Sequence, residues 1–489
     1  MQPISRRRAL QLGGLGLAAA AVGGIGLGWE LRTGDGDGGG TEGGTLTEPP
    51  VLRSSGGELS VQLEAARRRV RLAGRDATAL TYNGGVPGPT LYLRPGDRLR
   101  IRLTNRLAEA TNLHTHGLYV SPVGNGDNVF VSVAPGETFD YAYQLPVDHP
   151  PGVFWYHPHL HHMVADQLYG GLCGAIVVQD ADAVPVARER VLVISDVTLD
   201  GSGRVPAVSQ MERMAGREGR LVLVNGQLRP ELAARPGQRE RWRVVNACSS
   251  RFLRLRLDGQ PMELLGIDSG AQSTPTSLDE VVLAPGNRAD LLVTAVAGTS
   301  VLRTLRFDRG RVPGMGGGAA GAPEVELATL RVSGSAVADP GAVPARAAPA
   351  DLRGSEVVAR RQLTFAMGMG MGGGGGGGRG AGMAFTIDGR GFDPARIDQS
   401  VRLGSVEEWT IGNTSPMDHP FHLHVWPMQL IDDNGRAVDA PTWRDVINVP
   451  ARGQVTVRIR FDTFQGRTVY HCHILDHEDL GMMGVIEAH

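Results

Sequence analysis

The chain has 489 residues and a formal net charge of −2, with 49 basic residues, every one of them arginine, against 51 acidic residues. This balance excludes the basic surface that nucleic-acid binding requires, so no nucleic-acid partner is expected. The length suits three domains of about 130 to 150 residues each.

The first 32 residues read as an export signal or a membrane anchor. Three arginines at positions 6–8 precede an apolar, Gly- and Ala-rich stretch at 9–28, which is the order of a secretory signal. The adjacent arginines favour the twin-arginine route. Because the stretch approaches the roughly 20 residues that span a bilayer, an uncleaved anchor is the alternative. We predict export to the periplasm or the cell exterior, with residues 33–50 as a flexible Gly-rich linker.

Alternating apolar and polar residues predict β-strands along the remainder of the chain. Leu99, Ile101 and Leu103 alternate with arginines, and turns rich in Gly, Pro, Asn and Asp recur between such runs. Amphipathic helix patterns are few. The sequence therefore predicts an all-β protein made of three consecutive β-sandwich domains. The predicted boundaries are 51–182, 190–335 and 355–489.

A strand motif occurs three times and supports this division. Segments 93–105, 234–246 and 401–413 share a glycine, an alternating strand and a closing asparagine. Histidines stand nine and eleven residues after the first and third asparagines, whereas leucines stand at the same two distances after the second. These positions are His114 and His116, Leu255 and Leu257, and His422 and His424. Metal chemistry is therefore assigned to the outer domains, and the middle domain is interpreted as a structural spacer.

Histidines gather in four clusters that hold ten of the 14 in the chain. A single pair on a strand is usually structural, but four clusters beside a correctly spaced cysteine and methionine favour metal binding. The clusters are HTH (114–116), HPH (157–159), HPFHLH (419–424) and HCHILDH (471–477).

The last cluster offers ligands for two kinds of metal site around one cysteine. On a strand, His471 and His473 point to one face and Cys472 to the other. A thiolate, two imidazoles and a weak axial thioether are the ligands of a blue electron-transfer copper. The other members of such a set are His419, His477 and Met482. Pro158 replaces the cysteine in the related segment 155–160, so the first domain offers imidazoles without a thiolate.

These motifs resemble the multicopper oxidase family, which includes laccases, bilirubin oxidases and cuprous oxidases. The resemblance covers nearly the whole chain after the signal, and the HCH, HED and MM elements at 471–483 are similar to bacterial laccase-like enzymes. It implies cupredoxin-type Greek-key domains and four coppers per chain: one type 1, one type 2 and two type 3. No ligand position of the family pattern is missing.

Carried over residue by residue, the resemblance implies a ligand set for each copper. The type 1 ligands are His419, Cys472, His477 and Met482, and the type 2 ligands are His114 and His422. One type 3 copper takes His116, His157 and His473, and the other takes His159, His424 and His471. The trinuclear cluster would then lie between the first and third domains.

The resemblance further implies a laccase-like oxidase that removes single electrons from a small reductant and reduces O₂ to water. Phenols and aromatic amines are the first expectation, Cu(I) is the alternative, and Mn(II) and bilirubin rank lower. The reductant is expected to approach His419 and His477. Electrons would pass from Cys472 to its histidine neighbours. A monomer is expected.

Carboxylates near the trinuclear cluster would supply protons. Glu478 and Asp127 are the candidates, ahead of Asp476 and Asp479. The alternative for Glu478 is a solvated surface carboxylate. Three other classes of protein are less favoured. A non-enzymatic cupredoxin scaffold would have lost the copper ligands, and a copper nitrite reductase would lack the paired HxH motifs. A zinc enzyme does not need a His, Cys and Met set at this spacing.

Two further features leave alternatives open. Cys173 and Cys248 are interpreted as buried thiols in preference to a disulfide. The Gly-rich segments 313–323 and 366–385 are predicted loops, the second of them mobile. This second segment contains Met367, Met369, Met371 and Met383. Their thioethers are soft ligands that could bind Cu(I), as the resemblance to cuprous oxidases with methionine-rich inserts implies. Alternatively, these residues arose by drift in a low-complexity loop and have no function.

Overall fold

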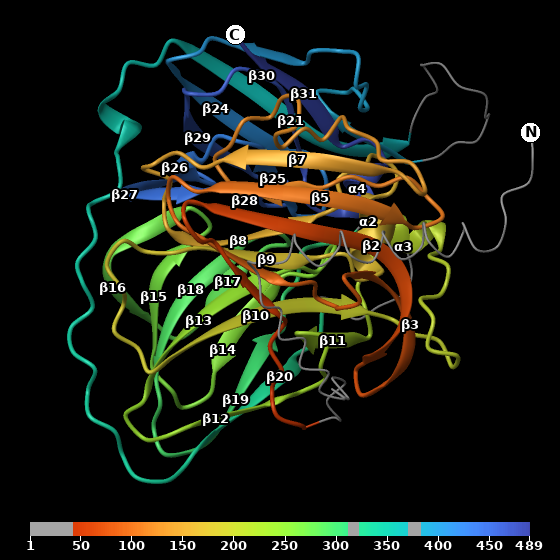
Figure 1. Ribbon diagram of the computed structural model, residues 1–489. Helices are drawn as coiled ribbons and strands as arrows, with labels where there is room; N and C mark the ends of the chain where they lie inside the picture. The colour runs from red at the N-terminus through yellow and green to blue at the C-terminus, as the bar shows by residue number, and fades with distance from the viewer. Residues whose placement is uncertain (1–42, 312–321, 370–382) are drawn as a thin grey trace, which may run out of the picture. The chain divides into compact units, whose positions relative to one another are not determined.

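The protein is described by a computed structural model over residues 43–311, 322–369 and 383–489. These residues form six β-sheets with a few short helices. In Figure 1 the three parts of the chain follow one another as orange, green and blue blocks of strands. The predicted all-β fold is confirmed, whereas the domain boundaries remain predictions.

The first sandwich encloses a core of apolar side chains between a five-stranded and a four-stranded sheet. The five-stranded sheet has the order β1 (Val51–Arg53), β4 (Thr90–Leu93), β9 (Gly174–Val178), β8 (Gly152–His157) and β6 (His114–His116). The other has the order β3 (Arg75–Tyr82), β2 (Glu58–Leu72), β5 (Arg98–Arg106) and β7 (Thr138–Gln144). The apolar residues that alternate with arginines on β5 are the buried ones.

The middle sandwich has a six-stranded and a five-stranded sheet around its own core. The larger sheet has the order β11 (Leu221–Val224), β10 (Arg188–Val197), β13 (Arg239–Asn246), β18 (Arg288–Thr294), β15 (Met262–Ile267) and β16 (Gly270–Leu278). The smaller has the order β12 (Glu231–Ala234), β20 (Val325–Val332), β19 (Gly298–Leu305), β14 (Leu253–Leu257) and β17 (Val281–Leu283).

The third sandwich repeats this six-plus-five arrangement. Its larger sheet has the order β22 (Met383–Ile387), β21 (Ala359–Met369), β24 (Ser405–Asn413), β29 (Gln454–Phe461), β26 (Met428–Asp433) and β27 (Arg436–Arg444). Its smaller sheet has the order β23 (Gln399–Val401), β31 (Met483–Ala488), β30 (Gly466–Cys472), β25 (His419–Leu423) and β28 (Val446–Val449).

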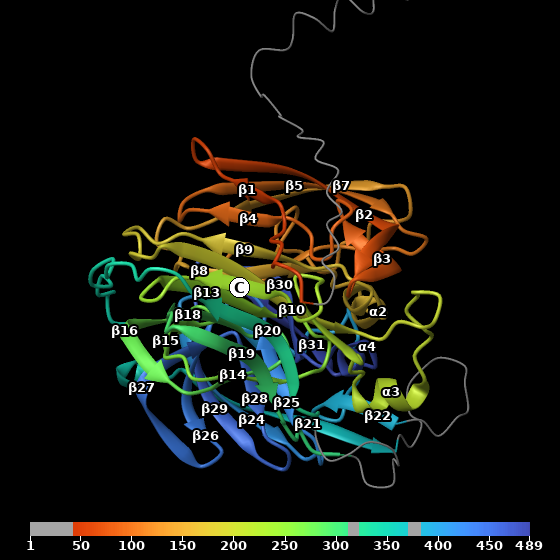
Figure 2. The ribbon, with the colours of Figure 1, turned by 90° about the horizontal axis from the view of Figure 1, so that it is seen from below.

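Three short α-helices join the sandwiches at one place. Helix α4 (Leu475–Asp479) contacts both α2 (Val164–Tyr169) and α3 (Gln210–Ala215), and all three lie on the same side of the ribbon in Figures 1 and 2. A 3₁₀ turn, η1, covers Leu352–Gly354. No helix within the described ranges has the length and apolar character to cross a membrane.

The closing asparagines of the three repeats have the same structural role. The side-chain oxygen of Asn105, Asn246 and Asn413 accepts a hydrogen bond from the backbone N–H two residues later, at 2.9, 3.1 and 2.9 Å. The side-chain amide of each donates to carbonyls four or more residues away. All three are buried, so each fixes the turn after a core strand.

Strand pairing then aligns the positions that follow these asparagines. His114 on β6 lies opposite His157 on β8, and His422 on β25 lies opposite His471 on β30. In the middle sandwich, Leu255 on β14 lies opposite Thr304 on β19. Both histidine pairs come from antiparallel neighbours, which places two HxH motifs together in each outer sandwich.

Part of the predicted linker at 33–50 is structured. Thr45 forms a parallel bridge with Glu231 of the middle sandwich, and Leu46 is buried in that sandwich's core. Residues 43–47 therefore pack on the middle sandwich, unlike the flexible tether predicted for this segment. The predicted signal or anchor at 1–32, and residues 312–321 and 370–382 of the two Gly-rich segments, lie outside the described residues.

Candidate metal centres

Eight histidines from the outer sandwiches converge at one buried place. The Nε2 atom of His471 lies 3.1 Å from Nε2 of His159 and 3.2 Å from Nε2 of His424. The rings of His114 and His424 stack with centroids 3.9 Å apart, as do those of His116 and His422. The convergence joins side chains more than 300 residues apart in the chain.

Donor atoms group into sets that could hold a metal ion. Within 4.8 Å of one another lie the donors of His159, His424 and His471, the set predicted for one type 3 copper. Three groups include a type 2 candidate: His114 with His422 and His424, His114 with His116 and His157, and His116 with His422 and Asp445. His473 belongs to no such group among the described residues, although its ring lies 4.9 Å from that of His116 and 5.8 Å from that of His157.

Several ring nitrogens in this cluster are buried without any hydrogen-bond partner within the described chain. They are Nε2 of His114, His157 and His422, Nδ1 of His116 and His424, and both nitrogens of His473. Burial, together with the neighbouring rings, lowers the pKa of these histidines, to about 3 for His157. Neutral imidazoles with free lone pairs are the state that a metal binds, so the donors fit copper.

The opposite ring nitrogens are held by the protein. Nδ1 of His114 lies 2.8 Å from Oδ2 of Asp127, and the other carboxylate oxygen accepts from Thr115 N–H at 2.8 Å. Nδ1 of His422 lies 2.7 Å from the Asp445 carbonyl, and Nδ1 of His157 lies 2.8 Å from that of Pro158. Such outer contacts fix the tautomer and the ring orientation that a metal requires.

Asp445 and Arg288 belong to this surrounding layer, and neither was predicted from the sequence. The Asp445 carboxylate lies 3.1 Å from Nε2 of His116 and accepts two hydrogen bonds from Arg288, at 2.5 and 2.7 Å. Arg288 is fully buried and comes from the middle sandwich. Its neighbour Gly286 packs on the ring of His473, so closely that a Cβ there would come within 2.9 Å. No local motif marks either residue.

Glu478 lies between two histidines of the cluster. Its carboxylate oxygens are 3.5 Å from Nε2 of His159 and 3.0 Å from Nδ1 of His471, and the side chain is fully buried. Burial opposes ionisation, but these rings hold the pKa of the carboxyl below its usual value. The alternative of a solvated surface carboxylate is therefore wrong.

Burial raises the pKa of Asp127, the other candidate carboxylate, to about 7.

A second cluster surrounds Cys472 at the end of β30. Its Sγ atom lies 3.3 Å from Nδ1 of His419 and 4.0 Å from Nδ1 of His477, and these two nitrogens are 3.3 Å apart. Sγ also accepts a hydrogen bond from the Ile474 N–H at 3.4 Å. Met482 is fully buried nearby, where its carbonyl accepts from the Cys472 N–H. Burial raises the pKa of the thiol, so a thiolate here needs a cation beside it.

Both histidines of this second cluster are buried and have their outer nitrogens occupied. Nε2 of His419 lies 2.8 Å from Ser415 Oγ. Nε2 of His477 lies 3.1 Å from the carbonyl oxygen of Met214 in α3, which belongs to the middle sandwich. The ring of Phe385 stacks on His477 at 4.6 Å. Both imidazole rings are fully buried, and the Met214 carbonyl of α3 occupies the outer nitrogen of His477. The approach of a reductant to His419 and His477 remains a prediction.

The remaining predicted residues have structural contacts. Asp476 binds Arg217 of the middle sandwich through both carboxylate oxygens. Asp479 accepts from two backbone N–H groups at the start of α2. Cys173 and Cys248 are free and buried, as the preferred interpretation stated.

Three family models, each described as multicopper oxidase, match this chain. They cover residues 64–183, 188–303 and 376–489. A solved structure described as a multicopper oxidase from Campylobacter jejuni, a metallo-oxidase, is 32% identical in sequence. The alignment covers 92% of this chain and 96% of that one, with a TM-score of 0.81. The cupredoxin-type architecture that the family resemblance implied is confirmed.

Two curated relatives are more distant and carry different names. "Multicopper oxidase mco" of Staphylococcus haemolyticus is 28% identical over 424 residues, which is 84% of both chains. "Cell division protein FtsP" of Edwardsiella tarda is 28% identical over 471 residues, or 94% of this chain and 92% of that protein. This chain is therefore similar, over most of its length, to proteins that carry two different names.

Proposed function

Since this chain belongs to the multicopper oxidase family, we propose that it is a laccase-like oxidase. It would couple the one-electron oxidation of phenols or aromatic amines to the four-electron reduction of O₂ to water. The observation that carries the proposal is the arrangement at the end of β30, where Cys472 lies in one donor cluster and the adjacent His471 in the other. One covalent path therefore links electron entry with oxygen reduction.

The proposed ligands follow the family pattern for four coppers. His419, Cys472, His477 and Met482 would hold type 1 copper, and the eight converging histidines would hold the type 2 and type 3 ions. Bound copper supplies rapid single-electron transfer at the thiolate site and O₂ reduction at the trinuclear site. The unpartnered buried nitrogens support this assignment, because an imidazole lone pair buried without a partner is costly unless a ligand uses it.

The chain's own residues orient these donors. Asp127 holds His114 through Nδ1, and the Asp445 carbonyl holds His422 in the same way. At the thiolate cluster, Ser415 and the Met214 carbonyl hold the outer nitrogens of His419 and His477. The open nitrogens then face the places where the metals would lie, which lowers the reorganisation needed on binding.

Glu478 and Asp127 are proposed to handle the protons that O₂ reduction consumes. Glu478 touches two of the converging histidines and is shielded from solvent. Asp127 contacts a third, His114. Both are within reach of groups at the cluster, which is the geometry that proton transfer requires.

Cu(I) oxidation is a second candidate. The Campylobacter jejuni relative is described as a metallo-oxidase. Three methionines, Met214, Met367 and Met383, pack against the third-sandwich core that contains Cys472 and Met482. Thioethers are soft ligands that favour Cu(I). A comparison of Cu(I) and phenol turnover on one preparation distinguishes the two substrates.

A scaffold role without catalysis is the contrasting candidate, raised by the relatives named FtsP. The intact donor clusters favour the oxidase. Export, by the twin-arginine route with or without a retained anchor, and a monomeric state complete the proposal.

The test is to purify the chain loaded with copper and to measure copper content, visible absorbance and O₂ uptake with a phenol. The oxidase requires about four coppers per chain, an intense blue colour from the thiolate site and phenol-dependent O₂ consumption. A colourless protein that binds no copper would favour the scaffold.

A further inference from the structure

One buried ion pair joins the middle sandwich to the helix that carries His477. Asp476, the residue before His477 in α4, is fully buried. The guanidinium of Arg217, two residues beyond α3, donates to both of its carboxylate oxygens, through Nε at 3.0 Å to each and through Nη2 at 2.5 Å. The backbone N–H of Arg217 donates to the same carboxylate at 2.9 Å. Asp476 is thus held by both the main chain and the side chain of one residue.

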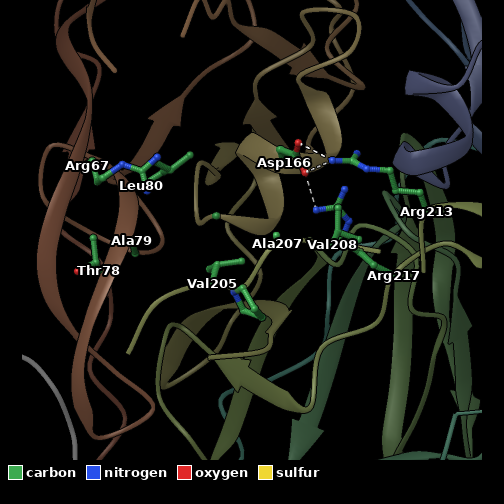
Figure 3. Close-up of a pocket in the computed structure, with 12 residues that line it drawn as sticks. Arg67, Thr78, Ala79, Leu80, Asp166, Val205, Ala207, Val208, Arg213 and Arg217 are labelled. Carbon is green, nitrogen blue, oxygen red and sulfur yellow. Dashed lines mark hydrogen bonds and ion pairs between the residues drawn. The ribbon is translucent and has the colours of Figure 1, made fainter. Parts of the chain in front are cut away.

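The same guanidinium reaches the first sandwich. Its Nη1 donates to Asp166 of α2 at 2.6 Å, and Arg213 of α3 donates to the other oxygen of Asp166 at 2.9 Å. Figure 3 shows both arginines directed at Asp166, at the edge of a pocket of about 460 Å³. The side chain of Asp166 is 40% exposed, whereas that of Arg217 is 6% exposed. The pair with Asp476 is therefore the buried half of this network, and the pair with Asp166 is its solvent-facing half.

Two adjacent residues of α4 are held by α3 and the turn that follows it. The Met214 carbonyl lies 3.1 Å from Nε2 of His477, and Arg217 holds Asp476. Because the two contacts are made by residues three positions apart on the opposite segment, α4 cannot slide or rotate against α3 without breaking one of them. The ion pair thereby keeps the carbonyl opposite the imidazole.

Close packing leaves the turn after α3 little room to shift. Gly216, between α3 and Arg217, has a φ of +73°, and a Cβ at its position would lie 2.6 Å from Cγ2 of Ile474. The carbonyl of Gly216 accepts a hydrogen bond from Arg309 Nη2 at 2.7 Å. The turn that directs the Arg217 guanidinium at Asp476 therefore packs directly on the residue that precedes α4.

The place of the carbonyl matters for the chemistry of His477. Because a carbonyl only accepts hydrogen bonds, Nε2 of His477 carries the proton. Nδ1 is then free to bind a metal beside Cys472 and His419. A ligand imidazole that donates its other N–H to a carbonyl is fixed in orientation and is a stronger electron donor. A stronger donor stabilises the oxidised metal, which lowers the reduction potential of a His₂Cys copper site.

We propose that Arg217 is a positioning residue for the type 1 copper site: by pairing with Asp476 it holds the Met214 carbonyl on His477 and lowers the reduction potential of the copper. This inference rests on the proposed oxidase function. Arg217 belongs to the middle sandwich, so the domain without ligand histidines on its own strand pair sets a property of the metal in its neighbour.

The experiment measures the reduction potential and the visible absorbance of the copper-loaded full-length chain by redox titration. Arg217→Met leaves Asp476 buried without its cation, and we expect a higher potential and a shifted blue absorption band. Arg217→Lys keeps the cation but loses the planar fork that contacts both oxygens, so the potential should shift less. Arg190→Met is the matched control, because Arg190 forms a similarly buried pair with both oxygens of Glu240 in the same sandwich, at 2.6 and 3.0 Å. It should destabilise the protein without moving the potential.

A second measurement needs no copper. Amide hydrogen exchange of the copper-free chain should become faster at residues 210–217 and 475–480 in Arg217→Met and should stay at the parent rate there in Arg190→Met. Unchanged exchange in Arg217→Met, or a potential that moves as far in the control, would overturn the inference. If the parent binds no copper, the proposed oxidase function fails, while hydrogen exchange still decides whether the ion pair holds α3 to α4. If Arg217→Met does not fold, Arg217→Lys takes its place, and parent values of both potential and exchange in that variant would contradict the proposal.

Discussion

The same strand pair occurs in all three sandwiches, but only two copies carry histidines. His114 and His157 face each other across β6 and β8, and His422 and His471 across β25 and β30. In the middle sandwich the corresponding residues of β14 and β19 are Leu255 and Thr304. The backbone frame is thus independent of the metal site, because a leucine core stabilises the pair where imidazoles are absent.

The middle sandwich nevertheless takes part in both centres. Arg288 pairs with the carboxylate beside His116, Gly286 packs on His473, and the Met214 carbonyl caps His477. The interpretation of this sandwich as a spacer is therefore incomplete. It has no histidines on its own strand pair and contacts the predicted ligands of its neighbours.

The largest expected effect comes from removing the one thiolate. Cys472→Ser should eliminate the blue absorbance and reduce phenol-driven O₂ uptake to background, because no other residue near the two histidines supplies a soft anionic ligand. Cys173→Ala, a free buried cysteine outside the clusters, is the control and should stay blue. A blue Cys472→Ser variant would disprove the assignment of this cluster.

Support from the middle sandwich can be tested at Arg288. Arg288→Met should lower the free energy of unfolding of the copper-free protein by about 3–5 kcal/mol, because it leaves Asp445 and Asp268 buried without their cation. Arg254→Met, which breaks an exposed pair with Glu280 in the same sandwich, should cost about 0–1 kcal/mol. Denaturant titration measures both. If both variants lost the same free energy of unfolding, the buried Arg288–Asp445 pair would stabilise the protein no more than an exposed pair does.

The empty strand pair can be challenged directly. Leu255→His should destabilise the protein by about 3 kcal/mol, because it buries an imidazole among apolar side chains. It should bind no additional copper, since Thr304 faces that position. Leu255→Met, which keeps the volume, should cost less than about 1.5 kcal/mol. Metal analysis that finds an extra copper would show that a single histidine is enough to create a site.

The smallest of the four effects is expected at Glu478, whose carboxylate touches histidines of both outer sandwiches. Glu478→Gln should slow O₂ turnover about 100-fold, equivalent to about 2.7 kcal/mol, by removing a proton carrier. Copper content should stay at the parent level. Glu487→Gln on β31 is the control. If Glu478→Gln turned over O₂ at the full rate with all coppers bound, the proton role would be wrong.

The sequence predicted the fold class and the histidines that converge in the structure, because both depend on local spacing. Alternation with a period of two marks strands, and an HxH motif on a strand presents both imidazoles on one face. Leu255, which stands where the outer repeats carry histidines, is fully buried. In contrast, nothing near Asp445 or Arg288 in sequence indicates that they meet beside His116.

What the sequence determined by itself was the chemistry that the chain can support: one cysteine among paired histidines in two of three similar modules. Only the tertiary structure decided how those side chains are held and reached. It buried Glu478 between His159 and His471 and placed the Met214 carbonyl of α3 on His477. The physical reason is that strand periodicity is a property of neighbouring residues, whereas these contacts join residues from different sandwiches, whose meeting depends on how the sandwiches pack.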